Sequence, residues 1–520
     1  MLVSRFLGIP REPSVLLEMV MKAIPAPPFA KAVRFKAFGM DPKRQLGLTR
    51  CEWVAPKDKI EAYMRSHKRQ GALFHPFASR FVDATNRVRP EPRSVYNPEA
   101  LFGDQFFNYW DDPNITWNEK AWSHARGKLA KAYSAIRGLK LMDLSDVETA
   151  IALAGNLDKA SGLPHITSKR EAIIAGDRYL ARRLRAGRTA PPPALGYYRT
   201  QPGKTRLVWC LPCSMIMLEG MIMSPIMSAL EYIETPYCLG LTSNSIAARM
   251  DELCYEKTQY CLDWSKFDST LPRRVIHACF DELRKWFVDR RDSVFDVVER
   301  YFVTCPIVMP DGYIYKGRKR GIPSGSWFTQ LIGSMANQLL TEYISYITGD
   351  RIVKGYYLGD DSVLAMGGDP DLVKWGVEAE KIGMRIHPDK QEVSHGKPHF
   401  LGHYWDGICP TRPVDESFSR FVCPERYIKH TDRTAYYKYE TSRVIALMVD
   451  NASFWDIGTE FLGWWLRRPV GAVKHTLVNQ GYLNATTVFT SWALSKQHKG
   501  DASRYVSGAR KSLAMQYLHH

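Results

Sequence analysis

The sequence lacks an uninterrupted run of 18 uncharged apolar residues, which is the length that a membrane-spanning helix needs. Arg5, Pro10 and Arg11 come too early in the chain for a signal peptide. The ten cysteines are scattered, and only Cys210 and Cys213 are closely spaced, so neither a disulfide framework nor a cysteine metal site is expected. We therefore predict a soluble protein of a reducing compartment with no membrane partner.

Acidic residues are too few to balance the basic ones. The chain has 71 Lys and Arg against 54 Asp and Glu, which gives a formal net charge of +17. Such an excess favours a polyanionic partner and predicts binding that weakens as salt is added. With 520 residues, 45% of them hydrophobic, the chain is long enough to bury a large core divided among several subdomains.

Two adjacent carboxylates stand between two predicted strands. Ile352 to Leu358 and Val363 to Met366 are rich in apolar and β-branched residues, and each stretch predicts a strand. Gly359, Asp360 and Asp361 then form the tight turn of a hairpin. An Asp-Asp pair in a turn is most often only solvated. At a hairpin tip, however, the same pair supplies the oxygen ligands that Mg²⁺ prefers.

An earlier acidic segment completes a candidate metal site. Tyr260 to Leu262 is typical of the end of a buried strand, so Asp263 is expected at its C-terminal tip, with Asp268 shortly after it. Pro272 then opens a helix whose apolar residues recur at helical spacing. Carboxylates from two strands around one point are what a two-metal clamp for phosphoryl transfer requires.

A loop of small residues precedes a long predicted helix. Gly321 to Ser326 form this loop, and apolar residues then recur at helical spacing up to Ile344. Small residues before a helix N-terminus expose backbone N–H groups that can approach a phosphate or a sugar. The alternative is a loop that only caps a core helix. Some of the polar residues on the helix, Thr329, Ser334 and Asn337, are expected to face the cleft.

Taken in order, these three segments resemble motifs A, B and C of viral RNA-dependent RNA polymerases. Asp263 and Asp268 match motif A, Pro323-Ser324-Gly325 with the polar helix matches motif B, and Gly359-Asp360-Asp361 matches motif C. In the residue sequence of motif B and in its length, the chain is most similar to the polymerases of bisegmented double-stranded RNA viruses, the partitiviruses and picobirnaviruses. The resemblance implies an α+β right-hand polymerase with fingers, palm and thumb, an RRM-like antiparallel palm sheet, and helix-rich fingers and thumb.

The resemblance also implies roles for individual residues. Asp263 and Asp360 would hold two Mg²⁺ ions with help from Asp361, and Lys390 matches the motif D lysine that protonates the leaving pyrophosphate. The residues implied to contact the nucleotide are Arg199, Lys204 and Arg206 of a motif F-like segment, and Asp268, Ser324, Gly325, Thr329 and Asn337. The residues implied to contact RNA are Ser161 and Gly162, which are similar to motif G, and the cluster Arg182, Arg183, Arg185 and Arg188. A nuclear-localisation signal remains an alternative for that arginine cluster.

One position departs from the pattern. Many related polymerases have Asn four residues after the motif B threonine, where it helps to select the ribose, but this chain has Gly333 there. Asp268, Thr329 and Asn337 remain as the candidates for reading the sugar.

The implied function is an RNA-dependent RNA polymerase that replicates and transcribes a viral RNA genome from ribonucleoside triphosphates, with Mg²⁺ or alternatively Mn²⁺. Its expected partners are template and product RNA and a viral capsid protein, and its expected location is the virion interior and the host cytoplasm. Residues 1–110 would be an extension that bridges fingers and thumb, 111–400 the interleaved fingers and palm, and 401–520 motif E and the thumb. Two rival functions are a reverse transcriptase and a non-catalytic basic RNA-packaging protein.

Overall fold

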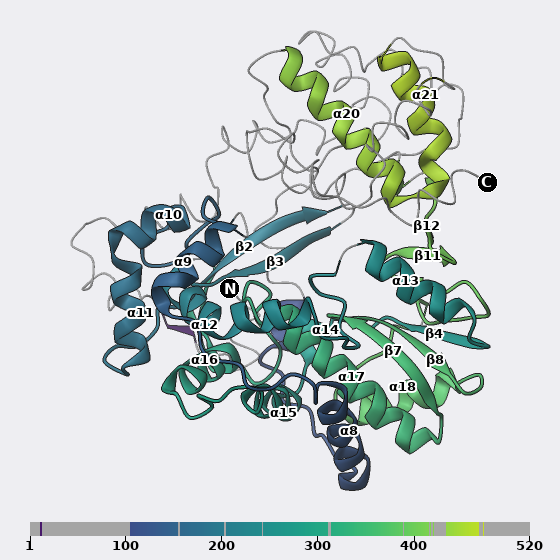
Figure 1. The fold of residues 1–520 in the computed structure, drawn as a ribbon. Coiled ribbons are helices and arrows are strands. Elements are labelled where there is room, and N and C mark those ends of the chain that lie inside the picture. The colour runs from purple at the N-terminus through teal and green to yellow at the C-terminus, as the bar shows by residue number, and fades with distance from the viewer. Residues whose placement is uncertain are drawn as a thin grey trace.

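The computed structural model describes residues 11–12, 104–466 and 472, with gaps at 154–155, 202–203, 242, 310–313, 388, 415, 418–419 and 421–432. Helices surround two separate β-sheets, and a third small sheet leads to a pair of C-terminal helices (Figure 1). Except for Arg11–Glu12 and 104–110, the predicted N-terminal extension lies outside the described residues.

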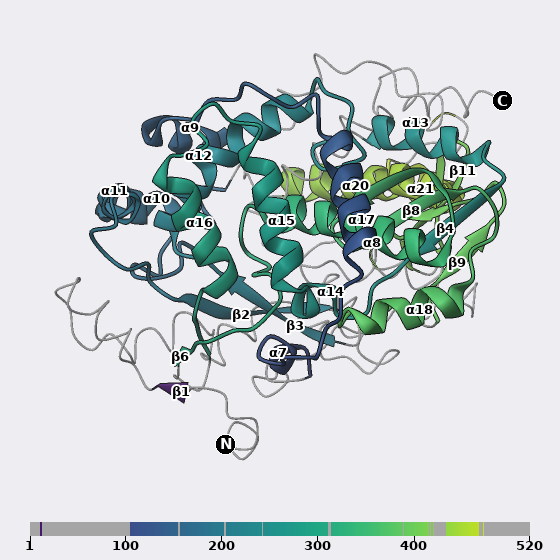
Figure 2. The ribbon, with the colours of Figure 1, turned by 90° about the horizontal axis from the view of Figure 1, so that it is seen from below.

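The first sheet has four antiparallel strands in the order β7-β8-β4-β9. These strands are β7 (Ile352–Leu358), β8 (Asp361–Met366), β4 (Thr258–Leu262) and β9 (Glu392–Ser394). All five residues of β4 are buried, because this strand lies inside the sheet and is covered on both faces. Two helices pack against the sheet, α17 (Thr329–Thr348) and α18 (Leu372–Lys381), and α15 (Arg273–Arg284) packs against α17 on the side away from the strands (Figure 2).

Helix α17 is the central helix of the molecule. Sixteen of its residues, from Thr329 to Ser345, are buried. It packs against β7 on one side and against α8 (Glu119–Ala132) on another, so its apolar residues are covered around most of its circumference. The helix ends at Gly349, which has a φ of 82° and forms a left-handed C-cap.

The second sheet has five strands in the order β1-β6-β5-β2-β3. Its long hairpin is β2 (Ala194–Gln201) with β3 (Lys204–Cys210), and its short strands are β1 (Arg11–Glu12), β5 (Ile307–Val308) and β6 (Ile314–Tyr315). Strand β1 pairs with β6, which joins the N-terminal segment to this sheet although about 300 residues separate the two strands. The hairpin extends from the helices at one side of the molecule toward its centre (Figure 1).

One buried helix, α12 (Cys213–Leu230), is long and apolar enough to cross a membrane by length and composition alone. However, 78% of this stretch is buried inside the protein, as in the core helix of a globular fold. Its neighbours α9 (Leu144–Leu153), α11 (Arg178–Arg185) and α16 (Ser293–Thr304) cover it (Figure 2). The shorter helices are α7 (Asp104–Asn108), α10 (Lys169–Ala172), the π-helical turn η3 (Ile173–Asp177), α13 (Ser243–Cys254) and α14 (Phe267–Thr270).

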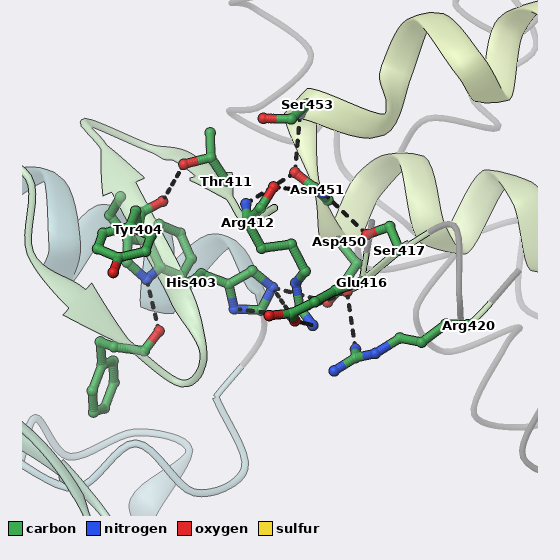
Figure 3. A network of polar contacts seen from close by, with 12 residues as sticks. His403, Tyr404, Thr411, Arg412, Glu416, Ser417, Arg420, Asp450, Asn451 and Ser453 are labelled. Carbon is green, nitrogen blue, oxygen red and sulfur yellow. Dashed lines mark hydrogen bonds and ion pairs between the residues drawn. The ribbon is translucent and has the colours of Figure 1, made fainter. Parts of the chain in front are cut away.

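The C-terminal part begins with a small sheet of β10 (His399–Phe400), β11 (His403–Asp406) and β12 (Cys409–Thr411). Helices α20 (Arg433–Asp450), η4 (Ala452–Phe454) and α21 (Trp455–Trp465) follow it. A polar network fastens the sheet to α20: His403 and Arg412 both bond to Asp450, with His403 Nε2 3.1 Å and Arg412 Nη2 3.2 Å from its carboxylate oxygens (Figure 3). Burial raises the pKa of Asp450, but the bonds to His403 and Arg412 outweigh it and hold this pKa below its usual value.

The strands predicted around the Gly-Asp-Asp turn are confirmed, since β7 spans Ile352–Leu358 and the turn is followed by β8. Asp361, however, is the first residue of β8 and not part of the turn. Between α18 and β9 the chain passes the end of β4 and forms one isolated bridge there, between Ile386 and Trp264.

Candidate active site

The register of the first sheet brings three aspartates together at one end of its strands, which is called the sheet edge below. Leu262, the last residue of β4, pairs with Ser362 of β8, so Asp263 emerges beside Asp361. Asp361 in turn pairs with Leu358 across the hairpin, and Asp360 occupies the turn between them. The carboxylates predicted to converge from two strands are therefore neighbours at this edge.

Helix α17 fixes the backbone of the turn through two side chains. The Gly359 N–H donates to Ser334 Oγ at 2.8 Å, and Asn337 Nδ2 donates to the carbonyl oxygens of Gly359 at 3.1 Å and Asp360 at 2.9 Å. Asn337 Oδ1 accepts a bond of 2.9 Å from Trp264 Nε1, which follows Asp263. Asn337 thus links both acidic segments to the helix. The role of Asn337 as a nucleotide contact stays a prediction; in this structure its amide is buried and is hydrogen-bonded to Gly359, Asp360 and Trp264.

Gly333 explains how closely the helix approaches the turn. A Cβ at position 333 would lie 3.3 Å from Cα of Gly359, which is tighter than most real contacts. Gly359 has a φ of 65°, so the turn also needs glycine on its own side. Packing therefore favours glycine at position 333, because a larger side chain would crowd the turn.

The carboxylates destabilise one another's charged forms. Burial, followed by the charges of Asp360 and Asp263, raises the pKa of Asp361 to about 7. Burial also raises the pKa of Asp360, and burial together with the charge of Asp360 raises the pKa of Asp268 to about 7. Partly buried carboxylates that repel one another are the environment in which a bound cation is favourable.

Two cations of the protein already face this cluster. Lys390 Nζ lies 2.9 Å from Asp263 Oδ2, and the lysine side chain is 57% exposed. Arg206 of β3 is close enough to lower the pKa values of Asp268 and Asp360. Oxygen donors at one edge fit a hard divalent ion by their chemistry. In the described part of the chain, however, no three acidic, His or Cys side chains form a ready-made metal cluster.

The loop before α17 is clamped from two sides. On one side, the Trp209 N–H of β3 donates to Ser324 Oγ at 3.2 Å, and a Cβ on Gly325 would lie only 1.7 Å from the Trp209 carbonyl oxygen. On the other side, Glu219 of α12 accepts from Ser326 Oγ at 2.6 Å and from the Trp327 N–H at 2.7 Å. Ser324 and Gly325 therefore hold the loop against β3 in this structure.

Comparison with known proteins identifies the family to which this arrangement belongs. Residues 125–416 match the model of the family described as viral RNA-dependent RNA polymerase. The chain belongs to this family. It is 32% identical over 173 residues to an RNA-directed RNA polymerase of Cryptosporidium parvum virus 1, a match that covers 31% of this chain and 32% of that protein. A second polymerase, from Atkinsonella hypoxylon virus, is 27% identical over 153 residues, which cover 27% of this chain and 23% of that one. The matched segments span a third or less of these relatives' length.

A solved structure agrees over a longer stretch. The crystal structure of the RNA-dependent RNA polymerase of a human picobirnavirus aligns with a TM-score of 0.63, covering 95% of this chain and 99% of that one at 17% identity. At that identity the likeness concerns the fold, which is the right-hand polymerase fold of mixed helices and sheets. The resemblance to the polymerases of partitiviruses and picobirnaviruses is confirmed.

The basic residues that are predicted to contact the incoming nucleotide lie on the β2–β3 hairpin. Arg199 and Arg206 stand opposite each other in its register and are both exposed. Lys204 pairs with Gln201 at the end of the hairpin, and its side chain lies outside the described residues. Thr329, a further predicted nucleotide contact, is buried, and its hydroxyl lies 2.6 Å from the Pro323 carbonyl oxygen, to which it donates.

The residues predicted to contact RNA are not brought to this site. Ser161 and Gly162 are buried, because the Cys213 N–H donates to the Ser161 carbonyl and Gly162 packs on the Leu211 carbonyl. A direct contact of these two residues with RNA stays a prediction; in this structure they pack against Leu211 and Cys213.

The arginine cluster is on α11 and just beyond it, at the side of the molecule opposite to the aspartates (Figures 1 and 2). Arg185 is bound to Asp292, with Nη2 2.5 Å from its Oδ2. Arg182, Arg183 and Arg188 are exposed. The cluster is thus placed to meet a partner on the outer surface and not at the aspartates.

Glu219 is the site residue that the sequence reasoning missed. Burial raises its pKa to about 7, although its bonds to Ser326 and Trp327 work in the opposite direction. The signal was present, because Glu219 is the single charged residue of an otherwise apolar helix. A lone carboxylate in such a helix needs a buried partner.

Proposed function

We propose that the protein is an RNA-dependent RNA polymerase that extends RNA from ribonucleoside triphosphates on an RNA template. The observation that carries the proposal is the meeting of Asp263, Asp360 and Asp361 at one sheet edge beside Arg206, in a chain of the viral polymerase family. Such an edge can bind a triphosphate between carboxylate-held cations and a basic strand.

The proposed cofactor is Mg²⁺, with Mn²⁺ as an alternative, held by Asp263 and Asp360 with help from Asp361. The ions would activate the attacking 3′-hydroxyl and neutralise the leaving pyrophosphate. The protein positions the reacting groups. Asn337 and Ser334 fix the turn that carries Asp360, and Arg206 of the β2–β3 hairpin binds phosphate oxygens, joined by Arg199 and Lys204. Lys390, beside Asp263, is the proposed donor of a proton to the pyrophosphate.

The four-stranded sheet with helices behind it is the proposed palm, and its antiparallel order β7-β8-β4-β9 supports an RRM-like arrangement. In this assignment residues 111–400 form the interleaved fingers and palm, and 401–520 form motif E and the thumb. The β10–β11 turn at Leu401 and Gly402 is the motif E hairpin. Residues 1–110 are the bridging extension, and the pairing of β1 with β6 supports a contact with the fingers.

Template and product RNA are the proposed macromolecular substrates, and the net charge of +17 supports a polyanionic partner. The exposed arginines of α11 are proposed to meet RNA at the outer surface of the fingers. A viral capsid protein as partner, and the virion interior and host cytoplasm as locations, are proposed from the likeness to polymerases of double-stranded RNA viruses.

Primer extension tests the function and its rivals together. Purified protein, RNA template and Mg²⁺ should incorporate ribonucleotides and not deoxyribonucleotides. A reverse transcriptase would prefer deoxyribonucleotides, and a packaging protein would incorporate neither. Asp263→Asn and Asp360→Asn should each abolish synthesis while RNA binding and melting temperature stay nearly unchanged, because each removes a charge that holds the metal.

Asp281→Asn is the matched control. Asp281 is an exposed aspartate of α15, with only a 3.7 Å contact to Arg126. This variant should keep wild-type activity. More than about a tenth of wild-type activity in either site variant would exclude these roles for Asp263 and Asp360.

A further inference from the structure

Helix α17 directs polar side chains at the Gly359–Asp360 turn, and three of them are already used by the protein. Thr329 donates to the Pro323 carbonyl. Ser334 donates to the Gln330 carbonyl at 2.7 Å and accepts from the Gly359 N–H. The side-chain amide of Asn337 donates to the turn and accepts from Trp264. Ser334 and Asn337 cannot bind a substrate in this arrangement without giving up a bond that positions the turn, and the Thr329 hydroxyl donates to the loop before the helix instead of facing the turn.

Gln330 differs from these neighbours. It lies in the first turn of α17 and is exposed, and within the described part of the chain no group is hydrogen-bonded to its side-chain amide. The amide lies against the turn, because a Cβ on Gly359 would be 2.7 Å from Gln330 Oε1. An unpartnered amide is therefore held next to the residue that precedes Asp360.

The position of Gln330 relative to Gly333 adds a second argument. Residues three apart share one face of a helix, so Gln330 projects from the same face as Gly333, one turn closer to the N-terminus. Position 333 leaves little room for a side chain, since its Cβ would lie 3.3 Å from Cα of Gly359 and the turn would have to shift to admit it. A longer side chain from position 330 reaches the space over the turn without entering that contact.

Asp268 is close enough to the same turn to interact electrostatically with Asp360. Its carboxylate interacts electrostatically with Asp360 and with Arg206, and among the described residues it has no hydrogen-bonding partner. Gln330 and Asp268 are thus two free polar side chains close to Asp360.

We propose that Gln330 is a specificity-determining residue that reads the ribose of the incoming nucleotide, in place of a side chain at position 333. The 2′-hydroxyl is both donor and acceptor, and a side-chain amide offers both complements. Asp268 shares the hydroxyl as an acceptor. The proposal rests on the proposed polymerase function, because it assigns the substrate of the same site.

The experiment compares single-nucleotide incorporation of GTP and 2′-deoxy-GTP by wild type, Gln330→Ala and Gln330→Met. Methionine keeps the length of the side chain and removes its hydrogen bonds. In both variants the ratio of kcat/KM for GTP over 2′-deoxy-GTP should fall about three- to tenfold, the effect of one lost neutral hydrogen bond. The ratio should fall because kcat/KM for GTP decreases, while kcat/KM for 2′-deoxy-GTP stays unchanged. Melting temperatures should not change, because the side chain is exposed.

Tyr346→Ala is the matched control, because Tyr346 is a 46% exposed residue near the other end of the same helix. Its ratio should equal that of wild type. An unchanged ratio in Gln330→Ala and Gln330→Met, or an equal loss on both nucleotides, would overturn the role of Gln330 while leaving the polymerase function intact. If wild type incorporates neither nucleotide, the polymerase function itself fails, and the role of Gln330 fails with it.

Discussion

Lys390 Nζ lies 2.9 Å from Asp263 Oδ2, so the lysine proposed to protonate pyrophosphate is bound to a carboxylate proposed to hold the metal. Burial raises the pKa values of Asp360 and Asp361, and the same ammonium group partly offsets that rise. Without a metal, Lys390 supplies part of the positive charge that this cluster needs. A metal held by Asp263 would compete with Lys390 for this carboxylate, which would leave the lysine free to face the phosphates.

This competition predicts two opposite effects of Lys390→Leu. The variant should bind Mg²⁺ more tightly, because the competing cation is gone. It should also turn over roughly 10²–10⁴-fold more slowly at saturating nucleotide, the range typical of a lost general acid. Single-turnover kinetics measure the rate, and the rise of melting temperature with added Mg²⁺ measures the binding.

Lys397→Leu is the control for this prediction. Lys397 also pairs with a carboxylate, Asp406 at 2.8 Å, but both side chains are more than 60% exposed and distant in sequence from the acidic turn. If Lys390→Leu changed only the nucleotide KM, Lys390 would be a phosphate-binding residue and not the acid.

Two glycines provide a test of the clamped loop. Gly325→Ala places a methyl group where the Trp209 carbonyl oxygen stands, and this contact is with backbone that cannot rotate away. The free energy of unfolding should fall by at least about 1–3 kcal/mol, as in other overpacked sites, and RNA synthesis should be lost.

Gly127→Ala is the matched substitution in α8, where an added Cβ has no heavy atom within 4 Å. It should raise the free energy of unfolding by roughly 0.5–1 kcal/mol, because alanine loses less backbone entropy in a helix. Chemical denaturation measures both changes. A Gly325→Ala variant as stable as wild type would mean that the loop can leave Trp209 at little cost.

The local elements around the site could be read from the sequence because their patterns are local. The alternating strand before Gly359, the strand before Asp263 and the helix after Ser326 each depend on neighbours in the chain. The spacing of the three motifs then indicated which of these elements meet. The family, and with it the fold, followed from residues that carry chemistry.

Contacts between distant segments could not be read in the same way. No local pattern indicates that Asn337 bonds to Trp264 or that the Ser161 carbonyl accepts from the Cys213 N–H, since these contacts depend on how whole helices pack. For both residues the motif implies a contact with substrate, while in this structure their polar groups bond to the protein itself. The exposed arginines of α11 illustrate the same limit, because charge predicts a polyanion but not the face that meets it.

The raised pKa values of the aspartates predict a pH-dependent response to metal. Asp361 has a pKa of about 7 in the folded protein, so below that pH it holds a proton that Mg²⁺ would have to displace. The increase in melting temperature on adding Mg²⁺ should therefore be larger at pH 8 than at pH 5.5. In Asp361→Asn the increase should be smaller and should depend less on pH. An equal increase at both pH values in wild type would contradict this account.

The last prediction concerns Glu219, whose carboxylate joins α12 to the loop before α17. Burial raises its pKa from 4.5 to about 7, so between these values the folded protein binds a proton that the unfolded chain has released. The free energy of unfolding therefore falls as pH rises from about 4.5 to about 7, and this one group contributes a loss on the order of 3 kcal/mol.

Glu219→Gln removes the titration and keeps the shape of the side chain. The melting temperature of this variant minus that of wild type should increase as pH rises from 5 to 8. Glu219→Ala should instead lose stability at every pH and lower the rate of RNA synthesis, because Ser326 and the Trp327 N–H lose their buried acceptor. Glu380→Gln, an exposed substitution on α18, controls for general effects of charge and should follow wild type. A constant difference between Glu219→Gln and wild type from pH 5 to 8 would show that Glu219 keeps one protonation state throughout, and that the loop is held by geometry alone.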